Sequence, residues 1–312
     1  MTAHVVQNNH LTGKALVLGG SGFIGQSMIA MLFGDRPVLI ADRVAPAGPQ
    51  NANITYLPLD FASGDFSSYL RGVNLIVHLI STVAPNAGTS TLVDEIAENL
   101  IPTVRLLDDV VRTREAPKLL FISSGGTVYG EGGRFPVTER DAASPICTYA
   151  AHKLAIEKYL HLYNVHHGLD YRIARLSNPY SSRAYTAGKP GAIPTFIEQM
   201  RKGKAVTVWG DGEQRRDFIH IDDAINAIGA ILSYSGPERL FNVGTGIGTS
   251  VNELIALIAS ELGVISPTVR HIAARACDVQ KNQLDISLLR TCTGWEPRIP
   301  LNEGIRRCIE ER

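Results

Sequence analysis

The chain has 312 residues, and 45% of them are hydrophobic, enough to bury a large core in one α/β unit or in two closely packed domains. Its 30 lysine and arginine residues balance its 30 aspartate and glutamate residues, which argues against nucleic acid as a partner. No apolar run is long enough to cross a bilayer, the start of the chain lacks a secretory signal, and the 4 cysteines show no CxxC spacing. We therefore expect a cytoplasmic protein with reduced thiols, no membrane partner and no metal site.

In the first half of the chain, short apolar runs alternate with amphipathic stretches. The predicted buried strands cover residues 14–19, 37–41, 75–80, 118–123 and 170–176, with a further short run at 55–59. The predicted helices between them cover residues 23–33, 91–114 and 149–166, and in the second of these apolar residues recur at intervals of three and four. Such alternation predicts a doubly wound parallel sheet with helices on both faces, an α/β fold.

After about residue 178 the segments become shorter and richer in glycine and proline. Helical patterns return at 194–202, 222–234, 250–262 and 302–310, and the third begins with the capping-box spacing of Ser250 and Glu253. Residues 240–243 read as a strand that can return to the main sheet. We expect a first domain over 12–177 and a smaller α/β domain mainly over 178–312, with 215–246 returning to the side of the first domain.

A glycine-rich turn follows the first predicted strand and opens the first helix, at Gly19, Gly22 and Gly25. The first glycine permits a tight turn, the second lets the backbone approach a pyrophosphate, and the third lets helix and strand pack closely. The helix N-terminus, with Phe23 and Ile24 in its first turn, favours the negative charge of that group. This pattern predicts a dinucleotide site.

The second predicted strand ends at Asp42, about twenty residues after the glycines. A carboxylate there accepts hydrogen bonds from both ribose hydroxyls of NAD and repels the 2′-phosphate of NADP. NAD is therefore the favoured cofactor, although Arg43 follows directly and keeps NADP as an alternative.

Two more strand ends are predicted to face the cofactor. Asp60 and Phe61 follow the short run at 55–59 and could flank the adenine, whereas Leu79, Ile80 and Ser81 would bring their backbone near the cofactor's middle. His78 is interpreted as a packed strand histidine and not as a catalyst.

Tyr149 and Lys153 lie four residues apart at the start of a predicted helix, which places them on one face, one turn apart. A free tyrosine has a pKa near 10 and is a poor base at neutral pH. A nearby ammonium and a positively charged nicotinamide ring would stabilise the phenolate and bring that pKa towards neutrality. The pair is therefore the predicted chemical centre.

Taken in order, these segments resemble the extended short-chain dehydrogenase/reductases and, within them, the NAD-dependent sugar epimerase/dehydratase family. The resemblance covers the chain after residue 13 and rests on LGGSGFIG (18–25), Asp42, HLIS (78–81), Asn99, SSGGTVYG (123–130), YAAHK (149–153), RLSNPY (175–180), WGDGEQRRDFIHIDD (209–223), FNVGTG (241–246) and RACD (275–278). It implies a Rossmann domain that binds NAD, a smaller domain that binds a nucleoside-diphosphate sugar, and a homodimer.

The resemblance also implies roles for single residues. Tyr149 would be the acid/base acting on a sugar hydroxyl, while Lys153 tunes it and holds the nicotinamide ribose. Asn99 and Ser123 belong to the cofactor side of the site. On the substrate side, the resemblance assigns the diphosphate to Asn178, Arg216 and Arg275, the nucleoside ribose to Asp278, and the base to Trp209.

The chain departs from the family at Gly125, where a serine or threonine usually supplies the third catalytic hydroxyl. Either Thr127 or Ser124 can fill that role, and we favour Thr127; a weaker centre with two residues is the other reading. In related dehydratases and decarboxylases, acidic groups fall at the positions of Gly126 and Thr127. Because neither residue can remove a carbon-bound proton at neutral pH, dehydration looks excluded.

The remaining pattern favours a 4-epimerase that acts through a transient 4-keto intermediate, on UDP-hexoses or UDP-N-acetylhexosamines. Asn282 matches a position that gates the sugar 2-substituent, and it is smaller than the tyrosine of stricter enzymes. Two alternatives stay open: a reductase of nucleotide-linked 4-keto sugars, and a non-catalytic relative that binds nucleotide as a regulatory subunit.

Overall fold

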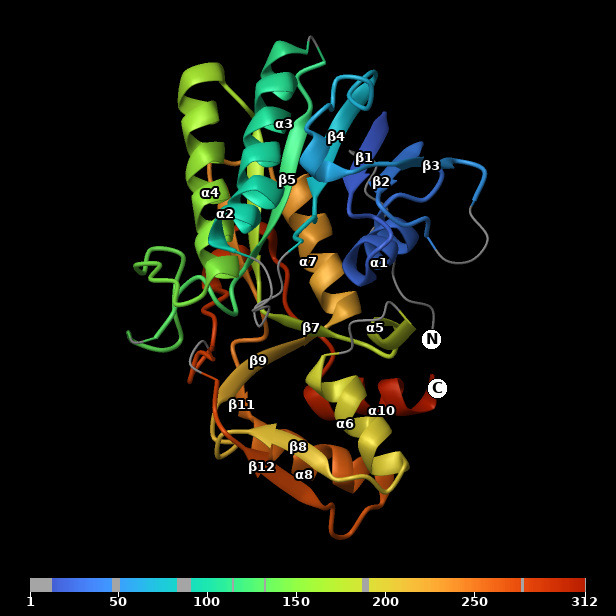
Figure 1. Ribbon diagram of the computed structural model, residues 1–312, viewed down its shortest axis with the longest axis vertical. Coiled ribbons are helices and arrows are strands. Elements are labelled where there is room, and N and C mark those ends of the chain that lie inside the picture. The colour runs from blue at the N-terminus through green and yellow to red at the C-terminus, as the bar shows by residue number, and fades with distance from the viewer. Residues whose placement is uncertain are drawn as a thin grey trace.

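The computed structural model describes residues 13–46, 51–82, 91–113, 115–131, 133–186, 191–275 and 278–311. Figure 1 shows two parts along the long axis of the molecule: a large sheet flanked by helices, and below it a smaller part built from short strands and helices. The site described below lies at the carboxyl ends of the large sheet's strands, on the side of the smaller part.

The large part is a seven-stranded sheet, parallel throughout, with the strand order β10-β6-β5-β4-β1-β2-β3. Its strands are β1 (Lys14–Leu18), β2 (Val38–Asp42), β3 (Ile54–Pro58), β4 (Val73–His78), β5 (Lys118–Ser124), β6 (Tyr171–Leu176) and β10 (Leu240–Val243). The predicted strands are confirmed to within two residues at each end, and β10 does pair with β6. Because the chain winds to opposite sides from β1, a crevice opens between the carboxyl ends of β1 and β4.

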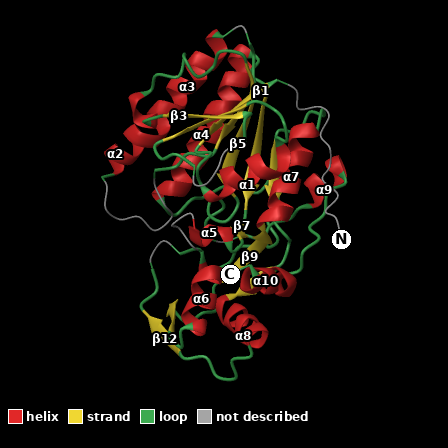
Figure 2. Ribbon diagram, turned by 90° about the vertical axis from the view of Figure 1, so that its right-hand side faces the viewer, coloured by secondary structure: helices red, strands yellow, loops and turns green. Residues whose placement is uncertain are grey.

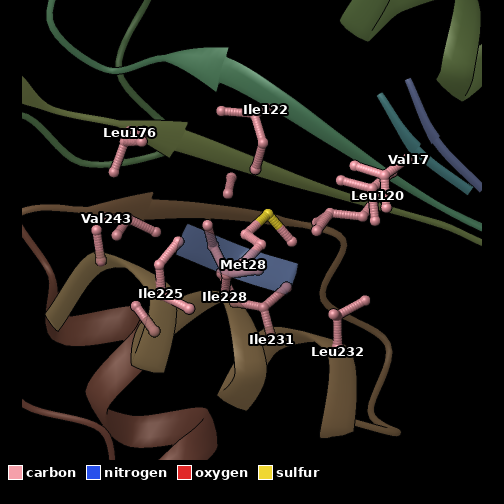
Figure 3. Packing of buried hydrophobic residues seen from close by; sticks show 14 of the residues in the cluster. Val17, Met28, Leu120, Ile122, Leu176, Ile225, Ile228, Ile231, Leu232 and Val243 are labelled. Atoms are coloured by element: carbon pink, nitrogen blue, oxygen red, sulfur yellow. The ribbon is translucent and has the colours of Figure 1, made fainter. Parts of the chain in front are cut away.

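Helices cover both faces of this sheet (Figure 2). On one face lie α1 (Phe23–Leu32), α7 (Ile221–Ser233) and α9 (Ser287–Thr293), and on the other α3 (Ile101–Arg112), α4 (Thr148–His167) and the short η1 (Phe61–Ser63). Figure 3 shows Met28 of α1 between the sheet and Ile225 and Ile228 of α7, all three fully buried. Burial on two faces explains why the strands read as continuous apolar runs.

The predicted helix over 91–114 is present in the structure, but it is irregular near its start. It consists of α2 (Leu92–Glu95), a π-helical stretch η2 (Ile96–Leu100) and α3. Pro102 has no amide hydrogen and cannot donate to the carbonyl of Glu98, which interrupts the α-helical ladder at this point. Of the predicted apolar stripe, Leu107 is buried in the core, whereas Val93 and Ile96 are exposed.

In the smaller part, the described residues form two short sheets and four helices. Its strands are β7 (Asn178–Tyr180), β9 (Arg215–His220) and β11 (Gly248–Ser250) in one sheet, and β8 (Val206–Trp209) with β12 (Val269–Ile272) in the other; its helices are α5 (Arg183–Thr186), α6 (Ala192–Arg201), α8 (Val251–Leu262) and α10 (Leu301–Glu310). The capping box of Ser250 and Glu253 is confirmed. Helix α7 is capped by the side chain of His220, which accepts a hydrogen bond from the amide of Asp222.

The chain passes between the two parts at the carboxyl ends of the sheet, where β6 leads directly into β7 and β9 leads into α7. Asp217 of β9 is fully buried and accepts hydrogen bonds from Thr245, Gly246 and Leu284, which fixes this junction. Over the described ranges, no helix has the length and apolar character needed to cross a membrane.

Candidate active site

The glycine turn joins β1 to α1, and Gly22 is the residue before the helix. A Cβ at Gly25 would lie 2.6 Å from the Cα of Gly20, so a side chain there would push the helix away from the turn. A Cβ at Gly22 would instead meet nothing closer than the carbonyl of Gly19 at 3.4 Å. The start of α1, at Phe23 and Ile24, is thus approachable by a phosphate group, and the turn fits a pyrophosphate.

Asp42 ends β2 beside this turn. Its Oδ2 accepts a hydrogen bond from the amide of Ser21 at 3.1 Å, and its Oδ1 accepts one from the amide of Arg43 at 2.7 Å. The guanidinium of Arg43 pairs with Asp60 at 3.2 Å, and both side chains are exposed. The carboxylate at the ribose position and the pairing of Arg43 both fit NAD better than NADP.

The segment after β4 lies against the glycine turn. A Cβ on Gly19 would touch Leu79 and Ile80 at 3.1–3.3 Å, and Ser81 follows them. Asn99 of η2 fixes the next residue, because its Oδ1 accepts from the amide of Thr82 at 2.8 Å and its Nδ2 donates to the Thr82 hydroxyl at 2.7 Å. In the structure, Asn99 thus fixes Thr82, the last described residue of the segment that follows β4.

Two residues of this region turn out to be core residues. The Nε2 of His78 lies 3.0 Å from the hydroxyl of Thr103, and burial lowers the pKa of His78 to about 3, so it is uncharged, as expected of a packed strand histidine. Phe61 is also buried, with its ring against Phe66 and His78. The side chain of Phe61 therefore does not flank an adenine, and only its backbone is left for such a contact.

Tyr149 and Lys153 occupy the first turns of α4 and point towards the end of β5. Lys153 is 4% exposed, and its Nζ donates to the carbonyl of Ile122 at 2.9 Å. The same nitrogen lies 4.7 Å from the ring centre of Phe121 and 5.8 Å from that of Tyr149. The sequence prediction that tyrosine and lysine share one face is confirmed.

Ser124, at the end of β5, brings a hydroxyl to the phenol of this centre. Tyr149 is hydrogen-bonded to Ser124, and Thr127 donates to the Ser124 Oγ at 2.8 Å. Ser124 therefore contacts the phenol directly, whereas the Thr127 hydroxyl is linked to it through Ser124. At Gly125 a Cβ would lie 2.7 Å from the backbone oxygen of Arg175, so the usual serine or threonine does not fit there.

The pKa values set by this chain's own groups differ from the sequence expectation. Burial raises the pKa of Tyr149 to about 12, and the hydrogen bond with Ser124 acts in the opposite direction. Burial lowers the pKa of Lys153 to about 7, against the opposing charge of Glu157. The phenol is thus a weaker acid than free tyrosine here, because desolvation outweighs the hydrogen bond with Ser124. A positively charged nicotinamide, when bound nearby, would lower the pKa of Tyr149.

Asn178, expected on the substrate side, begins β7. A Cβ on Gly126 would lie 3.5 Å from the side-chain amide nitrogen of Asn178, which places Asn178 next to the turn that carries Ser124 and Thr127. Asn282, expected near the sugar 2-substituent, is 2% exposed and donates to the carbonyl of Gly125 at 2.7 Å. Asn282 therefore holds the turn after β5 and is not open to a sugar.

A second cluster of predicted residues lies farther out, in the smaller part. Burial lowers the pKa of Arg216, and the charges of Asp278 and Glu131 oppose this, so the guanidinium faces two carboxylates. Arg275 lies over the ring of Trp209, 3.7 Å from its centre. A pocket of about 160 Å³ is lined here by Trp209, Gly210, Asp211, Gln214, Ala274, Asp278 and Gln280.

Comparison with known proteins agrees with this arrangement. The model of the NAD dependent epimerase/dehydratase family matches residues 15–244. The chain belongs to this family.

Its relatives match along almost their whole length. A Methanocaldococcus jannaschii protein, provisionally called a UDP-glucose 4-epimerase, is 32% identical over 94% of this chain and 96% of its own. The solved UDP-glucose 4-epimerase of Thermotoga maritima, with UDP-glucose, shares 29% identity and a TM-score of 0.87 over 95% of this chain and 97% of its own. That of Thermus thermophilus, in complex with NAD, shares 27% identity and a TM-score of 0.85 over 95% and 98%.

Membership of the epimerase/dehydratase family identifies the cofactor as NAD and the fold as Rossmann-type. It leaves the reaction open. A Streptomyces griseus dTDP-glucose 4,6-dehydratase is 28% identical over 96% of this chain and 94% of its own, and an Escherichia coli dTDP-4-dehydro-6-deoxyglucose reductase is 26% identical over 95% and 96%. The choice between these reactions has to come from the side chains of the site.

Sequence reasoning missed one buried group beside the family's tyrosine and lysine. Glu157 and Arg175 form an ion pair with an N–O distance of 2.6 Å, and Glu157 also accepts from the hydroxyl of Ser123 at 2.5 Å. The Ser123 side chain therefore turns to Glu157, and any contact with NAD is left to its backbone. The available signal was the spacing of Tyr149, Lys153 and Glu157, each four residues after the last.

The arrangement of the two hydroxyls, with Ser124 next to Tyr149 and Thr127 behind Ser124, can be tested by mutation. Replacing Ser124 with alanine removes the direct partner of Tyr149, and we expect kcat to fall by about 10²-fold. Thr127→Val removes only the outer hydroxyl at nearly constant volume, and the expected loss is about tenfold or less. Steady-state kinetics on both variants checks the order, and a larger loss from Thr127→Val would restore Thr127 as the third catalytic group.

Proposed function

We propose that this chain is an NAD-dependent nucleotide-sugar 4-epimerase acting on UDP-hexoses or UDP-N-acetylhexosamines through a transient 4-keto intermediate. The observation that carries the proposal is the pairing of a hydroxyl centre, formed by Tyr149, Ser124 and Thr127, with a glycine at position 126 facing Asn178. Hydroxyl groups suffice to move the proton of a sugar 4-hydroxyl. Removal of water across C5 and C6 needs an acidic pair, which glycine and threonine do not supply.

In this proposal each residue has one task. NAD, when bound, supplies a hydride acceptor and donor beside Tyr149. Tyr149 takes the proton from the 4-hydroxyl as C4 is oxidised, and returns it after the 4-keto sugar has turned over. Ser124 stabilises the oxygen that changes charge, and Lys153 holds the nicotinamide ribose and favours the phenolate.

The cofactor contacts that we propose follow from the crevice. The pyrophosphate lies on the glycine turn, the adenine ribose on Asp42, and the adenine between Asp60 and the backbone of Phe61. The remaining cofactor contacts come from Arg43, Leu79, Ile80, Ser81, Asn99 and Ser123, for the last two through the loop and backbone that they hold.

The diphosphate and nucleoside are assigned to the outer cluster. Arg216, Arg275 and Asn178 hold the diphosphate, because a planar guanidinium bonds phosphate oxygens in pairs. Asp278 and Trp209 line the pocket beside Arg275 and take the ribose and the base. The similarity to a UDP-glucose 4-epimerase solved with UDP-glucose supports this placement.

A panel of UDP-, dTDP- and GDP-linked sugars, incubated with the protein and a catalytic amount of NAD, tests the proposal. We expect NMR to show a UDP-sugar and its 4-epimer in equilibrium, with no net consumption of cofactor. Turnover only with stoichiometric NADH and a 4-keto sugar would instead identify a reductase. A 4-keto-6-deoxy product would identify a dehydratase.

The diphosphate contacts give a further prediction. In Arg216→Met we expect KM for the UDP-sugar to rise about 10- to 100-fold, since one charged hydrogen-bonding partner of the phosphate is lost. Arg215→Met is the matched control, because the side chain of Arg215 pairs with Glu253 and Gly248 on the other side of β9. Equal effects of both changes on KM would contradict the assignment.

We also propose that the protein works in the cytoplasm as a homodimer. Exposed apolar side chains gather on two neighbouring segments, at Leu92, Val93, Ile96 and Ile101 on α2–α3 and at Leu162 and Val165 on α4. Pairing with a second copy would bury this surface. Light scattering should give twice the chain mass for the wild type and a smaller mass for Val165→Glu; a monomeric wild type would refute the dimer.

A further inference from the structure

Glu157 occupies the helical turn of α4 that follows Lys153. The spacing of Tyr149, Lys153 and Glu157 places all three on the same face of the helix, with successive Cβ atoms about 5–6 Å apart. Glu157 is 5% exposed and its partner Arg175, on β6, is 4% exposed. An acid this deeply buried directly behind the chemical centre calls for an explanation.

The described hydrogen bonds of this carboxylate join it to the ends of β5 and β6. Oε1 accepts from the Nε of Arg175 at 3.0 Å and from the hydroxyl of Ser123 at 2.5 Å, and Oε2 accepts from the Nη2 of Arg175 at 2.6 Å. Lys153 bonds to the carbonyl of Ile122, the residue next to Ser123. Two adjacent residues of β5 thus anchor the lysine and the glutamate side by side.

Stability alone does not account for the pair. A buried ion pair costs desolvation on both sides, and replacing one with apolar residues is often neutral or stabilising. Here a second buried cation, Lys153, lies beside the pair, and burial lowers its pKa while Glu157 raises it. The negative charge of Glu157 therefore opposes the loss of the proton that burial would otherwise cause.

Other groups near Lys153 do not take over this task. His78 on β4 is held neutral, and Tyr149 on α4 carries its proton at neutral pH in the described structure. Arg175 on β6 is a cation, stacked on the ring of Tyr129 at 4.8 Å. From α2, Glu95 approaches α4 with its carboxylate 3.6 Å from the neighbouring side chain, His152.

We propose that Glu157 is a positioning residue of this active site: its carboxylate keeps Lys153 as an ammonium ion next to Tyr149 and holds the end of β5 through Ser123. This inference rests on the proposed function, because it assumes that the reaction at Tyr149 needs the charge of Lys153. It adds a fourth group to the centre, one that acts through Lys153 without touching the substrate.

Two variants separate the electrostatic role from simple packing. Glu157→Gln combined with Arg175→Met removes both charges of the pair, leaves no lone buried cation in the pair's place, and keeps an oxygen for the Ser123 hydroxyl. Arg175→Met alone leaves the negative charge of Glu157 facing Lys153. The titration of Lys153 should move to lower pH in the double variant but not in Arg175→Met, whereas a purely structural role would not separate the two variants.

The direct measurement is competitive acetylation of Lys153 with trace acetic anhydride across pH, read by mass spectrometry of its peptide in protein shown to be folded by circular dichroism. We expect the midpoint of labelling to fall by about one pH unit or more in the double variant and to stay or rise in Arg175→Met. An unchanged midpoint in the folded double variant would overturn the proposal. Should the double variant not fold, a fall of the midpoint in Arg175→Met would overturn it.

Activity adds a second readout. The alkaline limb of the kcat/KM profile should move to lower pH in the double variant, and each pH unit of that movement means about a tenfold loss of activity above the limb. If the wild type converts no nucleotide sugar, the proposed function fails. The acetylation of Lys153 still tests the role of Glu157, because it does not depend on activity. If the wild type is active but neither the midpoint nor the limb moves, the inference fails and the proposed function stands.

Discussion

Replacing Tyr149 with phenylalanine should lower kcat by about 10²- to 10⁴-fold, the range that a positioned acid/base contributes, with little change in KM. The change removes one oxygen from a half-buried ring beside Ser124 and leaves the contacts of Lys153 with Ile122 in place. The diphosphate contacts that we propose for Arg216 and Arg275, in the smaller part, are untouched. Steady-state kinetics with the substrate identified in the sugar panel measures both constants.

Tyr159→Phe is the control for this change. Tyr159 lies on the same helix and packs against the core between that helix and the sheet, away from Ser124. Its loss of a hydroxyl should leave kcat within about twofold to threefold of the wild type. A Tyr149→Phe protein that turns over as fast as this control would show that the phenol does not move the proton.

Lys153→Met should abolish most activity and, at the same time, stabilise the folded chain by about 1–4 kcal/mol at pH 7. Lys153 is buried, and its pKa falls from the ordinary 10.5 to about 7, so folding has to bury a charge that water would solvate. Methionine has a similar length and no charge. Urea unfolding of both proteins gives the difference, and a less stable variant would contradict the account.

The pH dependence of that difference has a definite sign. Between about pH 7 and pH 10.5 the unfolded lysine is protonated and the folded one is not, so the unfolded state binds more protons. The unfolding free energy of the wild type therefore rises with pH in this window, by about 1.4 kcal/mol per pH unit from this group alone. The advantage of Lys153→Met should be constant below pH 7 and shrink above it. An advantage that grows with pH would contradict the assignment.

Much of the fold could be predicted because it depends on short stretches of sequence. The strands of the main sheet are buried on both faces, so each is a short apolar run. The glycines of the first turn indicate that helix and turn pack closely, and the structure shows this at Gly25. The π-helical stretch η2 was not predicted, because the spacing of the apolar residues gives no sign of the hydrogen bond that Pro102 cannot make. His220, the last residue of β9, caps α7 with its side chain, which the usual capping preferences do not indicate.

The site was predicted less completely because contacts between elements leave little trace in a sequence. Tyr149 and Lys153 are one turn apart on a helix, so their common face is fixed by helix geometry. The choice of Ser124 over Thr127 depends on how the turn after β5 bends, and the packing of Gly125 against Arg175 decides it. Glu157 and Arg175 meet across a helix and a strand, and Phe61 turns inward to pack on Phe66.

In the proposed reaction, C4 loses and regains its hydrogen within the active site, and no proton is removed from carbon. Conversion of a UDP-sugar in D₂O with a catalytic amount of NAD, followed by NMR, tests this. We expect a 4-epimer that carries no deuterium at C4, C5 or C6. Deuterium at C5 or C6, or a 4-keto-6-deoxy product, would contradict it.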